Sequence, residues 1–342
     1  MRVVPVIDVG PWSGGDVDTR ATVAAAVDDA LRTVGFMQIV GHRIPDETIA
    51  AMVAASDAFF GMSLERKLAA RPDDLTVNRG YAASGSEALS YSIGEATPPD
   101  LFEAFNMGED NVDEADPFYA AERHRMFAPN IWPDDLPSLR PAMVAYFAEA
   151  RRVALQLTDI FADALGLTEQ WFRPFVSRST TTLRTINYER RAGDAEPVPG
   201  QQRMGAHTDY GVVTVLWADR TPGLEILDDA GNWISVVPED GALLVNLGDL
   251  TACWTNDRWR STLHRVVPPA GAGPVRRRST AFFFDADWDA LVTCVATCTD
   301  HDHPPKYPPV LAGEHLMAKL MGPRTLQPSE AANTAAGRLT FG

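Results

Sequence analysis

Apolar residues in the first half of the chain recur at the three- and four-residue spacing that is typical of amphipathic helices. Residues 21–34, 49–60 and 141–165 show this spacing and are predicted to be helical. Glycine follows the first and the third of these segments, at Gly35 and Gly166, where it commonly ends a helix. The third segment carries a single apolar stripe, so we expect it to pack along a core.

The segments between these helices have a different pattern. Residues 36–40 form a short apolar run that ends before Gly41 and predicts a strand. Residues 73–111 are rich in glycine, serine, proline and acidic residues, and this composition predicts an extended loop region.

From residue 180 onwards the pattern consists of short apolar or alternating runs that are separated by turn residues. Strands of this length at a spacing of roughly ten residues favour an antiparallel sandwich or barrel. Residues 301–309 are proline-rich and predict an extended segment, and residues 313–321 predict a helix. The runs that predict strands are 181–188, 212–217, 224–227, 233–237, 242–247, 263–267 and 278–284.

Composition narrows the class of protein. The chain is 45% hydrophobic and 22% charged, a balance typical of a globular protein, and no apolar run is long enough to predict a membrane-spanning helix. Its formal net charge of −16 disfavours nucleic acid and acidic membrane surfaces as partners. The three cysteines form no CxxC pair, which argues against a disulfide framework and against a zinc ribbon. Because the N-terminus also lacks a signal-peptide pattern, we expect a protein of the reducing cytosol.

Three residues in the second half have the chemistry of a metal site. His207 and Asp209 lie two positions apart in an extended segment, so their side chains point to the same side. His264 begins another apolar run and is the candidate for the third ligand. Two histidines and one carboxylate leave coordination positions open, which is the ligand set of non-haem iron(II) enzymes that activate oxygen. Taken singly, each histidine could equally be a bonded turn or core residue.

A second pair supports the metal hypothesis. Arg277 and Ser279 share one face of a predicted strand, and a guanidinium beside a hydroxyl among apolar residues can bind a carboxylate. Arg276 and Arg278 would face outward and fit a solvated edge strand. The loop at 268–274 predicts that this strand returns beside the one that carries His264.

With these residues in place, the chain resembles the isopenicillin N synthase-like group of iron(II)/2-oxoglutarate-dependent dioxygenases over nearly its full length. The resemblance implies a mixed α and β fold with a double-stranded β-helix (jelly-roll) core flanked by N-terminal and C-terminal helices. It also implies a mainly helical part at 1–175, the core at 176–290 and a C-terminal extension at 291–342, packed as one unit. The segments that carry the resemblance are 4–8, 35–42, 207–211, 245–250 and 254–266, together with Arg277 and Ser279.

The resemblance further implies which residues act. His207, Asp209 and His264 would bind iron(II), and Arg277 and Ser279 would hold the distal carboxylate of 2-oxoglutarate. Tyr188 matches the family's tyrosine on the preceding strand and would also contact 2-oxoglutarate, although Glu189 stands where the family usually has proline.

The implied reaction uses O2 and 2-oxoglutarate to oxidise an unactivated C–H bond of a small organic metabolite, with release of succinate and CO2. Hydroxylation, desaturation and ring formation all remain open, as do the substrate and the oligomeric state. Candidate substrate-lining residues, for which ordinary core packing is an equal alternative, are Tyr81, Phe102, Phe105, Tyr210 and Phe283.

Two alternative functions remain compatible with the sequence. The first is an iron oxidase of the same fold that does not use 2-oxoglutarate. The second is a non-catalytic jelly-roll that binds a ligand, although such a protein would usually have lost part of the metal triad. His301 and His303 imitate a metal pair but lie in a polar segment that predicts a solvated loop, and His42 is expected to be a bonded turn or core residue.

Overall fold

The computed structural model describes residues 4–74, 76–110, 112–113, 115–119, 124–268 and 273–327 of the chain. Its helices are α1 (Val17–Thr33), α2 (Asp46–Phe60), α3 (Leu64–Leu68), α4 (His124–Phe127), α5 (Leu139–Ala164), α6 (Asp249–Trp254) and α7 (Ala312–Thr325). Its strands are β1 (Val6–Asp8), β2 (Phe36–Val40), β3 (Gly80–Ala82), β4 (Glu103–Met107), β5 (Thr182–Arg190), β6 (Met204–His207), β7 (Val213–Ala218), β8 (Leu224–Leu227), β9 (Trp233–Ser235), β10 (Leu243–Leu247), β11 (His264–Val266), β12 (Val275–Phe284), β13 (Leu291–Val292) and β14 (Val310–Leu311).

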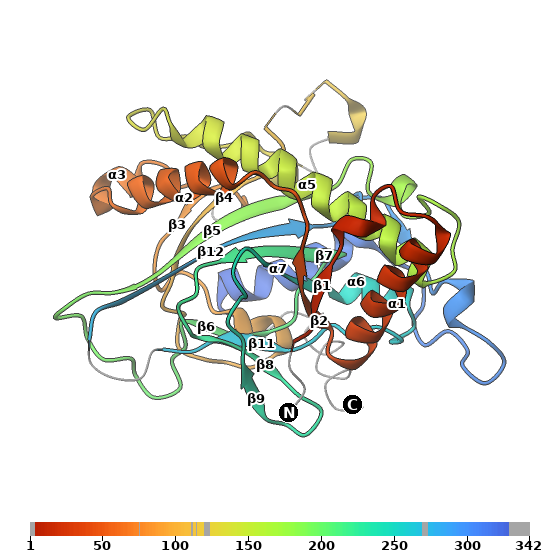
Figure 1. Cartoon of the computed structure of the whole chain (residues 1–342). Coiled ribbons are helices and arrows are strands. Elements are labelled where there is room, and N and C mark those ends of the chain that lie inside the picture. The colour runs from red at the N-terminus through yellow and green to blue at the C-terminus, as the bar shows by residue number, and fades with distance from the viewer. Residues whose placement is uncertain are drawn as a thin grey trace.

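Two facing sheets form a jelly-roll (Figure 1). The larger has the strand order β1-β2-β10-β7-β12-β5-β4-β3, and the smaller has the order β6-β11-β8-β9. Every pairing in these sheets is antiparallel except that of β1 with β2. Side chains from both sheets, among them Phe36, Ile186, Ile226 and Leu244, pack together as a buried apolar cluster. The sequence prediction of an antiparallel barrel or sandwich is therefore confirmed.

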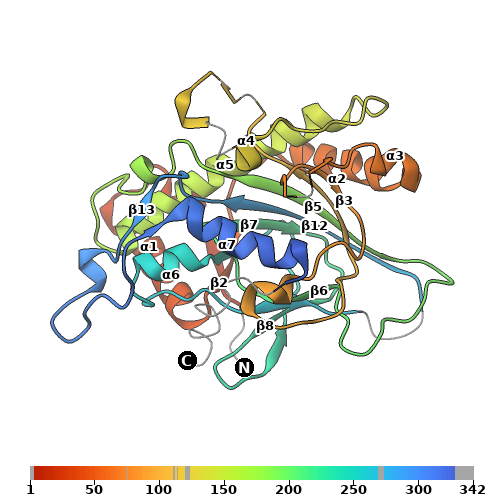
Figure 2. The same cartoon turned by 180° about the vertical axis from the view of Figure 1, so that it is seen from behind.

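Helices cover the outer face of the large sheet. Helix α5 lies across this face with α2 beside it (Figure 1), and its buried residues form the stripe predicted from the sequence. The stripe includes Phe147, whose ring meets that of Phe282 on β12 edge to face at 5.1 Å. On the other side of the molecule, α7 lies across the opening of the jelly-roll, next to a short 3-10 helix, η2 (Leu89–Ile93) (Figure 2). Among the described residues, no helix combines the length and the apolar character needed to cross a membrane.

Two expectations about the course of the chain were wrong. Residues 73–111 are not simply a loop, because they contain β3, β4 and η2, and β4 extends the large sheet beside β5. These strands are short and lie in a polar segment, so their pairing comes from the neighbouring sheet and not from a local pattern. In addition, β12 does not pair with the strand of His264. It pairs with β5 and β7, whereas β11 pairs with β6 and β8 in the other sheet. The loop between β11 and β12 lies in part outside the described residues.

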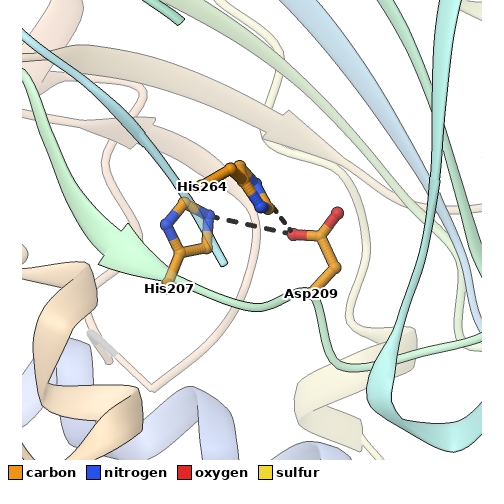
Figure 3. A group of neighbouring side chains, drawn as sticks. All are labelled: His207, Asp209 and His264. Atoms are coloured by element: carbon orange, nitrogen blue, oxygen red, sulfur yellow. Dashed lines mark ion pairs between the residues drawn. The ribbon is translucent and has the colours of Figure 1, made fainter. Parts of the chain in front are cut away.

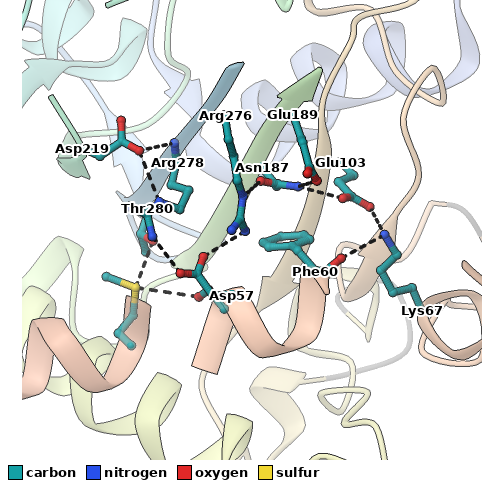
Figure 4. Close-up of polar contacts among 12 residues, drawn as sticks. Asp57, Phe60, Lys67, Glu103, Asn187, Glu189, Asp219, Arg276, Arg278 and Thr280 are labelled. Carbon is teal, nitrogen blue, oxygen red and sulfur yellow. Dashed lines mark hydrogen bonds and ion pairs between the residues drawn. The ribbon is translucent and has the colours of Figure 1, made fainter. Parts of the chain in front are cut away.

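Arg276 and Arg278 are not on a solvated edge strand, because β12 is an inner strand of the large sheet and α2 covers their side. Figure 4 shows both guanidinium groups converging on Asp57 of α2, at 2.9 and 2.7 Å. Arg278 also pairs with Asp219 at 3.2 Å, and Arg276 donates to the side-chain oxygen of Asn187 on β5 at 2.6 Å. We call Asp57, Arg276 and Arg278 the outer clamp. Side chains alternate along a strand, so Arg277 points inward when Arg276 and Arg278 are held on the outer face.

The outer clamp is expected to stabilise the fold. Substituting Asp57→Asn removes a carboxylate that serves two arginines in a half-buried place, and we expect the free energy of unfolding to fall by about 1–2 kcal/mol, between the values for exposed and buried pairs. Urea denaturation would measure this. Asp240→Asn, which removes a pair with Arg220 that is 3.9 Å long and largely exposed, is the control, with an expected change within about 0.5 kcal/mol. Equal effects of the two substitutions would contradict this role.

Candidate active site

Strand pairing brings the three predicted metal-ligating residues together. His207 at the end of β6 lies directly opposite His264 at the start of β11. Asp209 follows two residues after His207, and its Oδ1 lies 3.8 Å from Nε2 of each histidine (Figure 3). The three ligand atoms lie within 4.8 Å of one another, and all three side chains are buried. The extended geometry that places positions i and i+2 on one side therefore operates here as expected.

Hydrogen bonds orient each of these side chains. The Nδ1 atoms of His207 and His264 lie 2.8 and 3.1 Å from the backbone carbonyls of Gly205 and Thr262. A proton on Nδ1 satisfies these carbonyls and leaves the Nε2 lone pair facing Asp209. Burial, reinforced by the neighbouring His264, lowers the pKa of His207 well below its usual value, so its imidazole is neutral near physiological pH.

The carboxylate of Asp209 is held by one oxygen only. Its Oδ2 accepts hydrogen bonds from Thr214 Oγ1 on β7 at 2.5 Å and from Asn246 Nδ2 on β10 at 2.6 Å. Its Oδ1 is left to face the two histidines. Two imidazole nitrogens and one carboxylate oxygen around a common point suit a divalent first-row metal and leave coordination positions open, so the residues present fit iron(II).

We call residues 207–209, which carry two of the candidate ligands, the metal segment. A buried ion pair connects this segment to the C-terminal helix. Lys319 of α7 lies 2.9 Å from Asp249 of α6, and both side chains are almost completely buried. Asp249 accepts a hydrogen bond from Thr208 Oγ1 at 3.3 Å, and its backbone N–H donates to the carbonyl of Asp209 at 2.8 Å. Helix α7 is thus linked through Asp249 to Thr208 and Asp209, in the segment that carries two of the three candidate ligands.

Arg277, Ser279 and Tyr188 lie together inside the jelly-roll. Arg277 is 2% exposed, donates to Ser279 Oγ at 3.4 Å, and lies opposite Tyr188 in the pairing of β12 with β5. Its guanidinium is 5.1 Å from the centre of the Tyr188 ring. Within the described part of the chain, no carboxylate lies at ion-pair distance from Arg277, and its Nε has no acceptor. A buried guanidinium in this state fits an anionic ligand such as the carboxylate of 2-oxoglutarate.

Sequence reasoning did not find Arg203, which lies at the same place. It is 3% exposed, donates to the carbonyl of Val275 at 3.2 Å, and has no acceptor for Nη1 among the described residues. Burial and the charge of Arg277 lower its pKa. Two adjacent buried cations strengthen the fit to an anion. The residue stands four positions before His207, and no pattern in the sequence marked it.

A cavity opens beside the metal cluster. Of the five predicted substrate-lining residues, the structure places Tyr210 and Phe283 on its wall. Tyr81, Phe102 and Phe105 lie elsewhere: Tyr81 donates to Glu103, Phe105 packs on Phe59, and the Phe102 ring meets that of Tyr188. Residues lining the cavity that the sequence did not indicate include Asn78, Glu87, Arg184, Asp285, Leu316, Leu320, Pro323 and Arg324.

His42, His301 and His303 take no part in this cluster. His301 and His303 are exposed, as expected for a solvated loop. His42 is buried, accepts from the N–H of Ile44, and lies 3.1 Å from the carbonyl of Gly241, so it is a bonded core residue as predicted.

Known proteins resemble this chain at the levels of family and fold. Residues 4–135 match the family described as non-haem dioxygenase in morphine synthesis N-terminal, and residues 182–286 match the 2OG-Fe(II) oxygenase superfamily. The 2-oxoglutarate-Fe(II) type oxidoreductase hxnY of Emericella nidulans is 34% identical over 90% of this chain and 86% of its own length. Validamycin A dioxygenase of Streptomyces hygroscopicus subsp. limoneus is 36% identical over 86% of this chain and 80% of its own.

A solved structure gives the same picture. A Neurospora crassa protein crystallised in complex with alpha-KG and thymine superposes with a TM-score of 0.81 at 27% identity, covering 93% of this chain and 96% of that one. The jelly-roll fold, the metal-ligand cluster and the buried arginine all point to the same family as the relatives that match over most of their length. The chain therefore belongs to the 2OG-Fe(II) oxygenase superfamily and is an iron(II)- and 2-oxoglutarate-dependent dioxygenase.

Proposed function

We propose that His207, Asp209 and His264 bind the iron(II), and that Arg277 and Ser279 bind the distal carboxylate of 2-oxoglutarate with Tyr188 packed against the guanidinium. The reaction oxidises an unactivated C–H bond of a small organic metabolite by hydroxylation, desaturation or cyclisation, with succinate and CO2 as the other products. The observation that carries this proposal is the convergence of three buried ligand atoms within 4.8 Å beside an inward guanidinium without a carboxylate partner in the described part of the chain.

When bound, the iron supplies the activation of O2 that no side chain can provide. The protein residues supply orientation. Thr214 and Asn246 hold one oxygen of Asp209 and turn the other towards the histidines, while two backbone carbonyls fix both imidazole rings. Arg277 and Ser279 fix the orientation of a bound dicarboxylate by gripping its far end, and the buried setting strengthens each of these contacts.

The walls of the cavity exclude water and select the substrate. Leu316, Leu320 and Pro323 of α7 line it, and the buried Lys319–Asp249 pair holds this helix against the metal segment. Excluding water limits side reactions of a reactive centre, and a fixed wall decides which C–H bond lies next to the metal. Relatives named for small molecules, Validamycin A dioxygenase and a proline hydroxylase of Petromyces alliaceus among them, support a small organic substrate.

The family subgroup, the cellular location and the class of partners are also proposals. The match of residues 4–135 to a dioxygenase N-terminal family supports the isopenicillin N synthase-like subgroup. The three free cysteines support a reducing, cytoplasmic location. The net charge of −16 supports a protein without nucleic-acid or membrane partners.

Asp209→Ala tests the metal assignment. Removing the only charged ligand should abolish tight iron(II) binding and 2-oxoglutarate turnover, as measured by anaerobic metal titration and succinate formation. Asp302→Ala is the matched control, since it changes the exposed histidine–aspartate segment that imitates a metal pair and should leave both properties intact. Full iron binding and activity in Asp209→Ala would show that the metal lies elsewhere.

Asn246→Ala tests how the carboxylate is oriented. Without the amide donor, Oδ2 of Asp209 keeps only the Thr214 hydroxyl, and we expect metal affinity to fall by about 10- to 100-fold, the usual effect of losing such a partner. Competition with a metal chelator measures the affinity, and circular dichroism checks the fold. Asn232→Ala, in the turn between β8 and β9, should bind metal normally; a similar loss there would argue against a specific role for Asn246.

Arg277→Ala tests the 2-oxoglutarate assignment. Losing a buried charge-assisted contact should raise the 2-oxoglutarate concentration for half-saturation on the order of 100-fold, while iron affinity stays unchanged. Steady-state kinetics and metal titration separate the two effects. Arg265→Ala removes an arginine that pairs with Glu225 on the small sheet and should change neither. Unaltered 2-oxoglutarate dependence in Arg277→Ala would overturn the assignment.

A further inference from the structure

Asp285 is a buried carboxylate on the cavity wall that has no partner among the described residues. It follows the last residue of β12, is 5% exposed, and lines the cavity next to the metal cluster. The carboxyl lies directly over Gly211, where an added Cβ would come within 1.5 Å of Oδ1. Only glycine can therefore stand at position 211, two residues after Asp209, with Asp285 in this position.

An isolated buried carboxylate is unfavourable unless something binds it. Burial, together with the charge of Asp209, raises the pKa of Asp285 to about 8. No hydrogen bond joins Asp285 to Asp209, whose Oδ2 accepts from Thr214 and Asn246 and whose Oδ1 faces the two histidines. A cation or hydrogen-bond donor from a ligand is the group that would complete this position.

The same cavity also contains a cluster of side chains with a surplus of positive charge. Arg184 pairs with Glu87 at 2.8 Å, and both side chains are about nine-tenths buried. Arg324 donates to the carbonyl of Thr76 and to the side-chain oxygen of Asn78. It lies near enough to Glu87 that its charge, with that of Arg184, outweighs burial and lowers the pKa of this carboxyl. The Nε of Arg184 is buried and has no acceptor among the described residues. This cluster, which we call the basic group, would be completed by an anionic or acceptor group from a ligand.

We infer that the substrate is a small zwitterion of the amino-acid type, with its ammonium group at Asp285 and its anionic group at the basic group formed by Arg184, Arg324 and Glu87. This inference rests on the proposed function, because it places the substrate in the cavity beside the proposed iron site. The basic group carries one surplus positive charge, and the carboxyl of Asp285 ionises when an ammonium group pairs with it, so a zwitterion satisfies both positions. A substrate with a carboxylate but no ammonium group would leave Asp285 without a partner. A substrate with an ammonium group but no carboxylate would leave Arg184 without one. Much of the remaining wall is apolar, including Phe283, Leu316 and Leu320, and suits a hydrocarbon skeleton.

Anaerobic calorimetric titration tests the inference without using turnover. The probes are the free α-amino acids, proline included, each with its N-acetyl derivative, which lacks the ammonium group, and its amide, which lacks the carboxylate. The protein is loaded with iron(II) and 2-oxoglutarate. We expect at least one free amino acid to bind, and both derivatives of that amino acid to bind at least about tenfold more weakly, since each leaves a buried charge unpaired.

Two variants locate the ammonium contact. In Asp285→Asn the penalty for N-acetylation should disappear while the penalty for the amide remains. Asp289→Asn is the control, because Asp289 is an exposed acid four residues further on and should keep both penalties. The inference is overturned if no free amino acid binds, if the N-acetyl compounds bind as well as the free ones, or if Asp285→Asn keeps the preference.

Thermal unfolding separates recognition from a structural role. Asn has the same shape and no charge, so removing an unpartnered buried carboxylate should leave the Tm of the ligand-free protein unchanged or higher. A clear drop in Tm, with equal loss of binding for all probes, would mean that Asp285 supports the fold and would overturn the inference.

Iron and 2-oxoglutarate binding are measured first in the same samples. If both bind and the probes fail, the proposed function stands and only the substrate class falls. If iron does not bind, the proposed function falls, and the titration repeated on the metal-free protein still tests Asp285.

Discussion

The carboxylate of Asp209 is a negative charge buried in the interior of the jelly-roll, and most of the site is arranged around it. Thr214 and Asn246, from two strands of the large sheet, bind one of its oxygens. The other oxygen faces two histidine nitrogens at 3.8 Å. A buried charge is costly unless it is paired, and in the described part of the chain the only basic side chains at ion-pair distance from Asp209 are the two histidines. A divalent cation at the common point resolves this constraint, and the two-sheet fold supplies all the groups that hold the carboxylate in place.

One strand serves both faces of the large sheet. On the inner face of β12, Arg277 donates to Ser279 at the proposed carboxylate site, and on the outer face Arg276 and Arg278 bind Asp57 of α2. Because side chains alternate, the outer clamp and the inner site are fixed by the same backbone. The C-terminal helix is fixed in a comparable way, since the buried Lys319–Asp249 pair links α7 to the segment that carries the metal ligands. The stability of the fold and the accuracy of the site are therefore coupled.

Much of this arrangement could be predicted from the sequence, for reasons that are local. The pairs His207/Asp209 and Arg277/Ser279 each lie two residues apart, so strand periodicity alone places each pair on one face. The stripe of α5 follows in the same way from helical periodicity. Long-range pairing could not be predicted: nothing in residues 263–284 indicates that β11 and β12 belong to different sheets. The strands β3 and β4 have no pattern of their own and depend on β5 for pairing.

The cavity was the least predictable part, because its wall comes from segments that are distant in the sequence. Glu87, Arg184, Asp285 and Arg324 come from four elements or loops, and only the folded chain brings them to one place. Aromatic residues chosen for their type alone were divided between the cavity wall and the ordinary core. A polar residue that lies outside any motif becomes informative only once its burial and its lack of a partner are known.

We propose that iron(II) and 2-oxoglutarate bind side by side in this jelly-roll. An anaerobic titration of the purified protein with both, followed by visible absorption, tests this directly. We expect a metal-to-ligand charge-transfer band that appears only when both are present and saturates at one equivalent of each. Absence of the band at saturating concentrations, or binding of 2-oxoglutarate that does not depend on the metal, would contradict it.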